Sequence, residues 1–228
     1  MIRQIAAFIV LAVLLLPAGV AVGGPPAICE PVDVGPGVAI PIADRTRPSH
    51  APPRGPAHAD RTSLVDRVLR VLDSSDSALV HMETLRRATL EANADRAVAH
   101  ALFARLVART LDAEATGSPD ALRWFDAGYL AQCYDQINMR VVRSHGRTRG
   151  LTGYAWVQHA LELRGDDAEM EFGAAVMTVM AGLPEHTLHV ARVEALAAPG
   201  SLVARNLEQH RTNRWKHFES RATKRTDR

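Results

Sequence analysis

Histidines are the first candidates for chemistry in this sequence of 228 residues, which contains ten of them. His186 and His189 are spaced three apart near the start of an expected helix, so their side chains share one face of it. Such a pair supplies half of a zinc site, which needs at least one further ligand. No H-E-x-x-H motif and no Cys-x-x-Cys pair supplies that ligand. We therefore expect two ordinary histidines, with a metal site as the alternative, and we expect no cofactor.

Nucleophilic catalysis needs an activated serine or cysteine beside a histidine and an acid. The sequence has no G-x-S-x-G motif, and the neighbours of Cys133 give no sign of activation. His159 and Glu162 are one helical turn apart, as a general base and its orienting group would be. Such a pair also arises by chance on a helix surface. We expect a non-catalytic protein, and an envelope hydrolase or metal-dependent enzyme whose site is assembled only in three dimensions is the alternative.

Positive charge gathers in one short segment, where Arg140, Arg143, Arg147 and Arg149 occur with His145 and without an acid. Arginine side chains bind phosphate or carboxylate groups in bidentate fashion. The same charges also stabilise the carboxyl end of a helix through its macrodipole. The segment is a candidate anion-binding loop, and a solvated helix cap is the other interpretation.

Aromatic side chains mark a candidate binding face. Trp124 and Tyr129 lie on one expected helix, and Tyr154 lies near the start of the next. Large aromatic residues dominate binding interfaces and protein cores alike. We expect Trp124 and Tyr129 to contact a ligand together with the four arginines, and a core position is the alternative for each aromatic residue.

The residues around Trp124 resemble a known repeat family. The stretch 121–129 is similar to the first helix of a tetratricopeptide unit, with Trp124 and Gly128 at the family's separation. The resemblance covers roughly 65 residues, and it implies a helical repeat fold that binds a protein or peptide without catalytic residues. An irregular bundle of helices is the alternative. The second candidate unit contains Trp156, Ala160, Leu163 and a closing Pro184.

Helical patterns extend from Ser63 almost to the end of the chain. No segment alternates as a strand would, so the sequence predicts an all-α fold of consecutive antiparallel helical hairpins, either repeat-like or an irregular bundle. The helix at 167–182 is apolar on most sides and is expected to be central. Helix N-caps are expected at Ser63, Ser118, Asp166 and Ser201, with Glu169 completing a capping box on Asp166. The expected helices are 63–73, 77–91, 94–113, 119–143, 152–164, 167–182, 185–197 and 201–219.

The amino terminus has the three parts of a secretory signal peptide. Arg3 precedes an apolar run from Ile5 to Leu16, and small residues follow it. We expect residues 1–23 to be removed and the protein to be periplasmic or secreted. An uncleaved membrane anchor is the alternative, because apolar character continues through Val22.

The rest of the chain divides at changes in composition. Ten of the thirteen prolines precede position 57, so residues 24–60 form a proline-rich and mostly irregular leader. Within it, residues 32–41 are expected to lie along the body as an extended strip, with disorder as the alternative. Residues 61–220 form the helical domain, and residues 221–228 form a basic tail.

The chain has two cysteines, Cys29 in the leader and Cys133 on an expected helix. An exported chain folds where disulfides are permitted, so these two residues are candidates for a bond that pins the leader to the body. A buried Cys133 and an unrelated Cys29 are the equal alternative.

Composition limits the partners. Hydrophobic residues make up 47% of the chain and charged residues 23%, as in an ordinary globular protein, and a formal charge of +2 gives no reason to expect nucleic acid. Trp215 and Phe218 near the basic end are expected to dock on the body, and contact with an anionic membrane surface or envelope polymer is the alternative. The sequence therefore predicts an exported, non-catalytic binding or scaffold protein of the cell envelope, with a protein or peptide partner.

Overall fold

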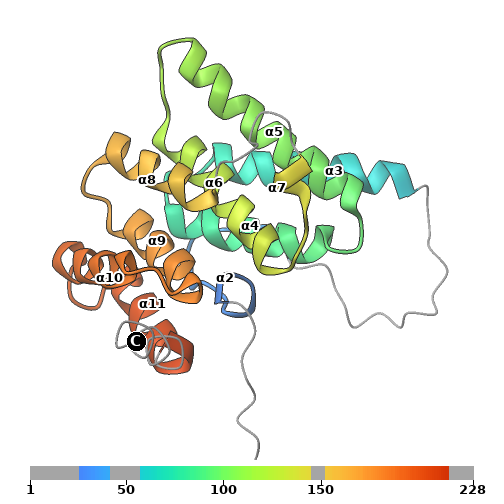
Figure 1. Cartoon of the computed structure of the whole chain (residues 1–228). Coiled ribbons are helices and arrows are strands. Elements are labelled where there is room, and N and C mark those ends of the chain that lie inside the picture. Colours follow the sequence, from blue (N-terminus) through green and yellow to red (C-terminus); the bar gives the residue numbers. More distant parts are fainter. Residues whose placement is uncertain (1–25, 42–56, 145–151, 216–228) are drawn as a thin grey trace, which may run out of the picture.

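All regular structure in the described part of the chain is helical, as the sequence predicts. A computed structural model describes residues 26–41, 57–144 and 152–215, and these ranges contain no strand (Figure 1). The expected signal peptide and basic tail lie outside the described residues. The helices are α2 (Pro26–Cys29), α3 (Ala57–Asp73), α4 (Ala78–Ala92), α5 (Arg96–Ala115), α6 (Ala121–Gln136), α7 (Val141–Ser144), α8 (Gly153–Arg164), α9 (Ala168–Ala181), α10 (Glu185–Leu196), α11 (Leu202–His210) and the π-helical turn η3 (Arg211–Trp215).

Polar side chains cap most of these helices at their amino ends. Ser201 caps α11 as predicted, by accepting a hydrogen bond from the N–H of Ala204. Three predicted caps are wrong. Asp120 and Asp167 cap α6 and α9 in place of Ser118 and Asp166, and α3 begins six residues before Ser63, directly after Pro56. Residues 57–62 contain two alanines and neither glycine nor proline, so nothing in this stretch prevents the helix from beginning before Ser63.

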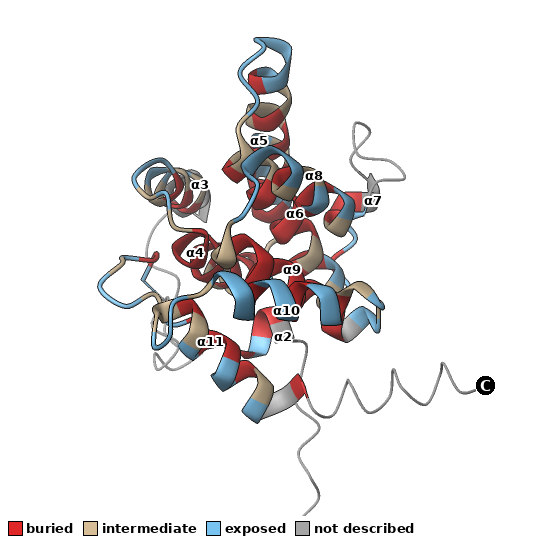
Figure 2. Ribbon diagram, turned by 90° about the vertical axis from the view of Figure 1, so that its left-hand side faces the viewer, coloured by how far each residue is buried: buried red, intermediate tan, exposed pale blue. Residues whose placement is uncertain are grey.

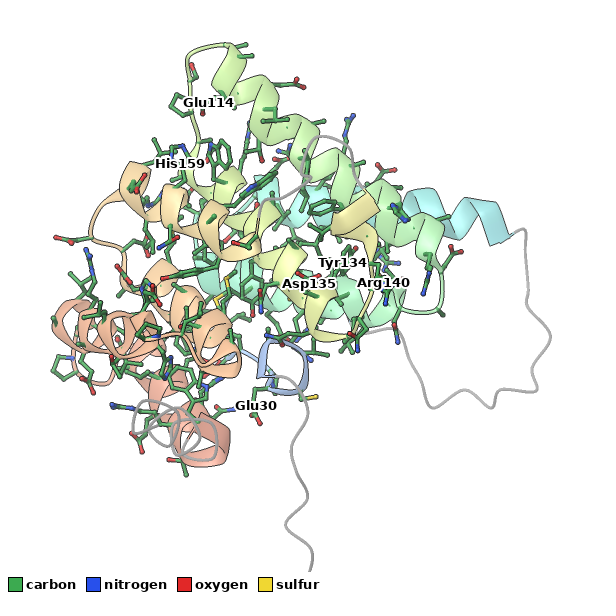
Figure 3. All side chains as sticks on the ribbon, in the orientation of Figure 1. Glu30, Glu114, Tyr134, Asp135, Arg140 and His159 are labelled. Atoms are coloured by element: carbon green, nitrogen blue, oxygen red, sulfur yellow. The ribbon has the colours of Figure 1, made fainter. Side chains whose placement is uncertain are left out.

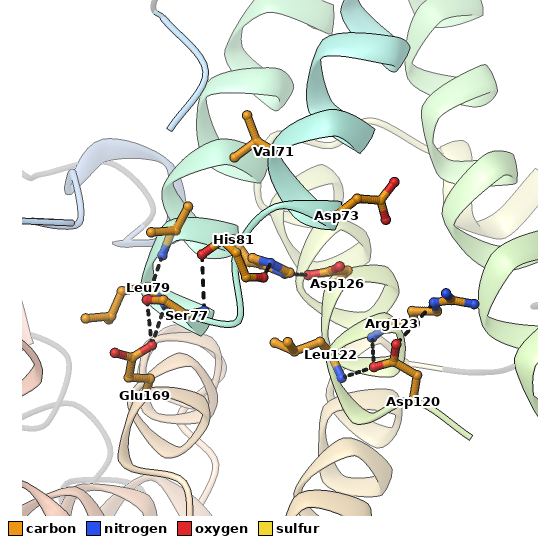
Figure 4. Close-up of polar contacts among 12 residues, drawn as sticks. Val71, Asp73, Ser77, Leu79, His81, Asp120, Leu122, Arg123, Asp126 and Glu169 are labelled. Atoms are coloured by element: carbon orange, nitrogen blue, oxygen red, sulfur yellow. Dashed lines mark hydrogen bonds and ion pairs between the residues drawn. The ribbon is translucent and has the colours of Figure 1, made fainter. Parts of the chain in front are cut away.

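A long-range cap replaces the capping box that was expected at the start of α9. The carboxylate of Glu169 accepts hydrogen bonds from the Ser77 hydroxyl at 2.8 Å and from the Leu79 N–H at 3.2 Å (Figure 4). Glu169 therefore satisfies donors at the start of α4, where the positive end of the helix dipole favours a carboxylate. This contact joins α9 to α4.

The single helix predicted at 119–143 is two helices. Asn138 adopts a left-handed conformation with φ 56°, and this residue separates α6 from α7. Asparagine tolerates that conformation better than most residues because its short polar side chain bonds locally. The helical pattern continues across the break, and for that reason periodicity alone did not reveal it.

Helices α4, α6 and α9 form the centre of the molecule. Every residue of α9 from Met170 to Val179 is buried, which confirms its predicted central position, and so is every residue of α4 from Ala78 to Arg86 (Figure 2). The remaining helices pack around these three. Trp215 is fully buried against Phe172 and His210, so the predicted docking of the carboxyl end is confirmed for this residue.

Residues 26–41, here called the strap, run across the body from α2 onward. Val32, Ala39 and Ile40 are buried, so the expected strip of residues 32–41 does lie along the helices. Figure 1 shows the strap as the blue segment that passes beneath the central helices. Its irregular backbone is consistent with the predicted leader.

Two glycines allow close contact between α6 and α8. A Cβ atom on Gly128 of α6 would lie 2.6 Å from the carbonyl oxygen of Gly153 at the start of α8, and a Cβ on Gly153 would likewise clash with the Gly128 carbonyl. The backbones of α6 and α8 therefore touch directly. This close contact holds α8, and the side chains that it carries, in a fixed position relative to α6.

We predict that Gly128→Ala destabilises the protein by about 1–3 kcal/mol, because the added methyl group meets backbone atoms that cannot move aside. In a helix without this contact, the same change would stabilise the protein by up to about 1 kcal/mol. Urea unfolding followed by circular dichroism measures the difference.

The matched control is Gly117→Ala, where the added methyl group meets open space and only the positive φ of 70° opposes the change. This control should cost about 1 kcal/mol. A Gly128→Ala protein as stable as the parent would contradict the contact.

Candidate functional site

Three helix ends meet at one edge of the molecule and form a concave surface. They are the carboxyl end of α5, the amino end of α6 and the carboxyl half of α8. Asp120 fixes the beginning of α6, because its side chain accepts hydrogen bonds from the N–H groups of Leu122 and Arg123 (Figure 4). Helix ends leave main-chain donors and acceptors at the surface, where a ligand can reach them.

The surface contains a depression of about 680 Å³, here called the notch. Its lining is mixed, with apolar side chains beside hydroxyl groups and two arginines. Leu163 is 39% exposed, which is unusual here for a large hydrophobic residue. The lining residues are Ala113, Thr116, Ser118, Pro119, Asp120, Ala121, Arg123, Leu163 and Arg164.

Aromatic side chains continue the surface beyond the notch. The ring of Trp124, one turn along α6 from Ala121, stands edge-on to the rings of His159 and Trp156, with centroids 4.7 and 5.2 Å away. The indole N–H of Trp124 donates to the carboxylate of Glu114 at 3.3 Å. Trp124 is half-buried, and Figure 3 shows Glu114 and His159 on the same side of the molecule. We call Glu114, Trp124, Trp156 and His159 the aromatic rim.

The charges of the notch are held in local ion pairs. Arg123 Nε lies 3.2 Å from the Asp120 carboxylate, and Arg164 Nε lies 3.0 Å from Asp167. Both arginines are more than a third exposed. Exposed ion pairs contribute little free energy, so either arginine can exchange its partner for an acidic group of a ligand.

The structure places Trp124 at this surface but places Tyr129 elsewhere. Tyr129 is fully buried and stacks on Phe125, with ring centroids 5.7 Å apart. Burial raises the pKa of its phenol well above the usual value. The prediction that Tyr129 contacts a ligand is therefore wrong, because five residues beyond Trp124 the helix has turned toward the core.

The predicted arginine loop is described only in part. Arg140 is exposed in the turn between α6 and α7, and Arg143 belongs to α7. Figure 3 shows Arg140 in the region of Asp135, away from the notch. Arg147 and Arg149 lie outside the described residues, so the anion-binding loop stays a prediction.

The two histidines with metal-ligand spacing are buried and serve different partners. His186 donates from Nδ1 to the carbonyl oxygen of Ala175 at 3.0 Å. His189 contacts Glu171 through Nδ1 at 2.5 Å and the Tyr154 hydroxyl through Nε2 at 2.6 Å. Within the ranges that the structure describes, no group of three His, Cys, Asp or Glu residues is arranged to hold a metal ion.

A hydrogen-bonded chain through His189 joins three helices. Tyr154 of α8 donates to His189 of α10, which donates to the buried carboxylate of Glu171 in α9, and Arg192 also donates to that carboxylate at 2.7 Å. Burial, with the charges of Glu185 and Glu171, raises the pKa of Tyr154 to about 12, so the phenol stays protonated. The His186/His189 spacing pointed to this region but not to Tyr154 or Glu171.

The second histidine pair with an acid, His159 and Glu162, lies at the surface. His159 Nδ1 is 3.4 Å from the Glu162 carboxylate, and the Glu162 side chain is largely exposed. The imidazole belongs to the aromatic rim, where it packs against Trp124. The described neighbours of His159 are an aromatic ring and an exposed carboxylate, and neither is a serine or cysteine nucleophile.

Both cysteines are free thiols in the structure. Cys29 is exposed on α2 and Cys133 is fully buried in α6. Burial raises the pKa of the Cys133 thiol to about 12, so it stays protonated and unreactive. The candidate disulfide is not formed in the structure, and the arrangement matches the equal alternative of a buried structural Cys133.

Comparison with known proteins gives no relative for this chain: no family model, no curated protein and no solved structure matches it. The tetratricopeptide resemblance therefore stays a prediction. Among the helices of the described ranges, none is both long enough and apolar enough to cross a membrane.

A buried ion pair lies between α4 and α6. His81 donates from Nδ1 to the Asp126 carboxylate at 2.7 Å and from Nε2 to the Ser75 carbonyl oxygen at 2.8 Å (Figure 4). The Ser75 carbonyl oxygen can only accept, and so can the Asp126 carboxylate in its ionised form, so both ring nitrogens carry hydrogen in the ion pair. Burial by itself would lower the pKa of His81, but the charge and hydrogen bond of Asp126, with the Ser75 carbonyl, outweigh it and raise the pKa.

We predict that stability falls as the pH rises above about 6.5, the ordinary pKa of histidine. The folded pKa of His81 is raised, so its contribution is complete below the unfolded pKa and is lost as the pH passes the folded pKa. The free energy of unfolding by urea, measured between pH 6 and 9, tests this.

The matched variants separate this pair from other titrating groups. In Asp126→Asn, burial acts on His81 without the carboxylate that raises its pKa, so the fall in stability above about pH 6.5 should disappear. Exposed Asp76→Asn should leave the parent's slope unchanged. An Asp126→Asn protein with the parent's slope would contradict the assignment.

Proposed function

We propose that this chain is an exported, non-catalytic binding or scaffold protein that recognises a protein or peptide through the notch and the aromatic rim. The observation that carries the proposal is the position of Trp124. Its ring is held between Glu114 and His159 and is partly open to solvent beside a depression of about 680 Å³.

The aromatic rim suits binding because it is already ordered. The indole of Trp124 is held by a hydrogen bond and by two ring contacts. A ligand that covers it therefore binds with little further loss of side-chain conformational entropy. Tryptophan and arginine are the residues that most often dominate protein interfaces. Trp124 and Arg123 are neighbours here, at the start of α6.

The lining of the notch indicates the kind of partner. Leu163 and Ala121 contribute apolar surface to the lining, and Arg123 and Arg164 contribute positive charge. A peptide segment with an apolar residue next to an acidic one would fill the depression and pair with an arginine. The exposed pairs of these arginines with Asp120 and Asp167 would be exchanged for the ligand's carboxylate.

Export and the stacking of helices belong to the same proposal. The apolar segment within residues 1–23 supports export to the periplasm or beyond, with membrane anchoring by that segment as the alternative. The spacing of α8 to α11 supports consecutive helical hairpins, which would present the notch at one edge of the stack.

We predict that Trp124→Ala weakens partner binding by about 30-fold, since truncating a central interface tryptophan typically costs about 2 kcal/mol or more. The test begins with affinity capture from an envelope fraction by the full chain. The captured protein is then identified and its dissociation constant is measured by calorimetry.

The matched control is Leu188→Ala, which removes a side chain that is 65% exposed on α10. This variant should bind as the parent does, and circular dichroism should show both variants folded. A partner that binds Trp124→Ala and the parent equally well would remove the notch from the proposal.

A further inference from the structure

Buried polar side chains hold the strap by its main chain. Arg86 donates to the carbonyl oxygen of Ile28 at 2.9 Å, and Glu83 accepts from the N–H of Val32 at 3.0 Å. These contacts recognise backbone groups that any residue carries. The strap is therefore held in the way that an extended peptide ligand is held, by donors and acceptors presented to its backbone.

Asn206 of α11 contacts both main-chain groups of one strap residue. Its side-chain oxygen accepts from the N–H of Asp33 at 2.8 Å, and its side-chain nitrogen donates to the carbonyl oxygen of Asp33 at 2.8 Å. An amide side chain used in this way replaces a neighbouring β-strand. Gln136 of α6 contacts one main-chain group near the start of the strap, because its side-chain oxygen accepts from the N–H of Ala27 at 3.0 Å.

The strap lies in a site that we call the groove, whose polar contacts come from Glu83, Arg86, Arg87, Gln136 and Asn206. Side-chain packing makes the groove selective for this segment. Ala27, Ile28 and Ile40 are buried among the helices, and α2 contacts α4, α6 and α9. Close approach is required at Gly37, where a Cβ atom would lie 2.6 Å from a methyl carbon of Val80. A foreign peptide would have to reproduce these fits, whereas another copy of the strap reproduces all of them.

An empty groove would be energetically unfavourable, because its buried charged side chains would lose hydrogen-bond partners. Glu83 and Arg86 are buried, and Arg87 donates to Glu83 at 2.7 Å and to the carbonyl oxygen of Ile40 at 2.7 Å. Burial alone would raise the pKa of Glu83, but the hydrogen bonds and charges of the two arginines, with the Val32 N–H, lower it. Loss of the strap would leave these charged groups short of partners, so the groove requires an occupant.

We propose that the groove accepts the strap of a second copy of this chain, so that two molecules exchange residues 26–41. Exchange of an identical element creates a dimer at little cost, because each contact made within one chain is made again between two. The fifteen residues 42–56 that join the strap to α3 span at most about 50 Å when fully extended.

Two defective full-length chains test the exchange by complementation. Ile40→Asp damages the strap and leaves the groove intact, and the double variant Arg87→Ala/Asn206→Ala damages the groove and leaves the strap intact. Unfolded together and refolded, they should form a mixed 1:1 dimer, detected through a tag on one chain and by light scattering. Each variant refolded alone should stay monomeric, and the mixture should melt at a higher temperature than either.

A fluorescent peptide of residues 26–41 gives an independent measurement, and Ile40→Ala replaces Ile40→Asp if the latter fails to fold. The peptide should bind the strap-defective chain saturably, and adding Asn206→Ala to that chain should weaken binding at least about tenfold, because two hydrogen bonds are lost. Absence of both binding and mixed dimers, with folded variants, overturns the proposal. Peptide binding without mixed dimers also overturns it, since the groove would then take only a free segment.

Trp124→Ala separates this inference from the proposed function. The aromatic rim shares no residue with the groove, so this substitution should leave mixed-dimer formation unchanged. Dimers that disappear in Trp124→Ala would show that the notch, and not the strap, joins the two chains, and would overturn the exchange.

Discussion

A buried carboxylate, that of Glu83, places the strongest constraint on this fold. Removing a charge from water is costly unless hydrogen-bond donors replace the solvent, and here Arg86, Arg87 and the Val32 N–H replace it. The arginines in turn need acceptors, which the carbonyl oxygens of Ile28 and Ile40 supply. One charge at the centre of α4 thereby determines where the amino-terminal segment lies.

Hydrogen bonds between polar side chains also join the other central helices. His81 and Asp126 connect α4 to α6, and Glu169 closes the amino end of α4 from α9. Direct backbone contact between Gly128 and Gly153 then sets the position of α8. Because α6 and α8 are fixed in this way, Trp124 and His159 meet with little freedom, and a rigid surface forms where helix ends converge.

Local signals in the sequence were sufficient to predict the all-helical class and the bounds of several helices. Periodicity and capping residues are short-range properties, and the helices at 78–92, 168–181 and 185–196 lie within a residue or so of where they were expected. The apolar character of α9 predicted its central place. The break at Asn138 was missed because a left-handed residue leaves no trace in the hydrophobic pattern.

The candidate site was predictable only in part. Trp124 could be singled out because a large aromatic residue is conspicuous in any sequence. The sequence did not show which side of this helix faces the core, so the position of Tyr129 was predicted wrongly. The contact of Tyr154 with His189 and Glu171 joins three helices and has no signature along the chain. Glu114 likewise reaches Trp124 from another helix.

The burial of α9 on every side has a consequence for how the molecule opens. From Met170 to Val179 no side chain faces solvent, so this helix cannot fray or detach while its neighbours stay in place. Its amide hydrogens reach water only when the helices packed around it, α4, α8 and α10 among them, separate from it, which amounts to unfolding of the whole molecule. Deuterium uptake in α9 therefore reports global stability, whereas the exposed ends of α5 and α10 exchange through local fluctuations.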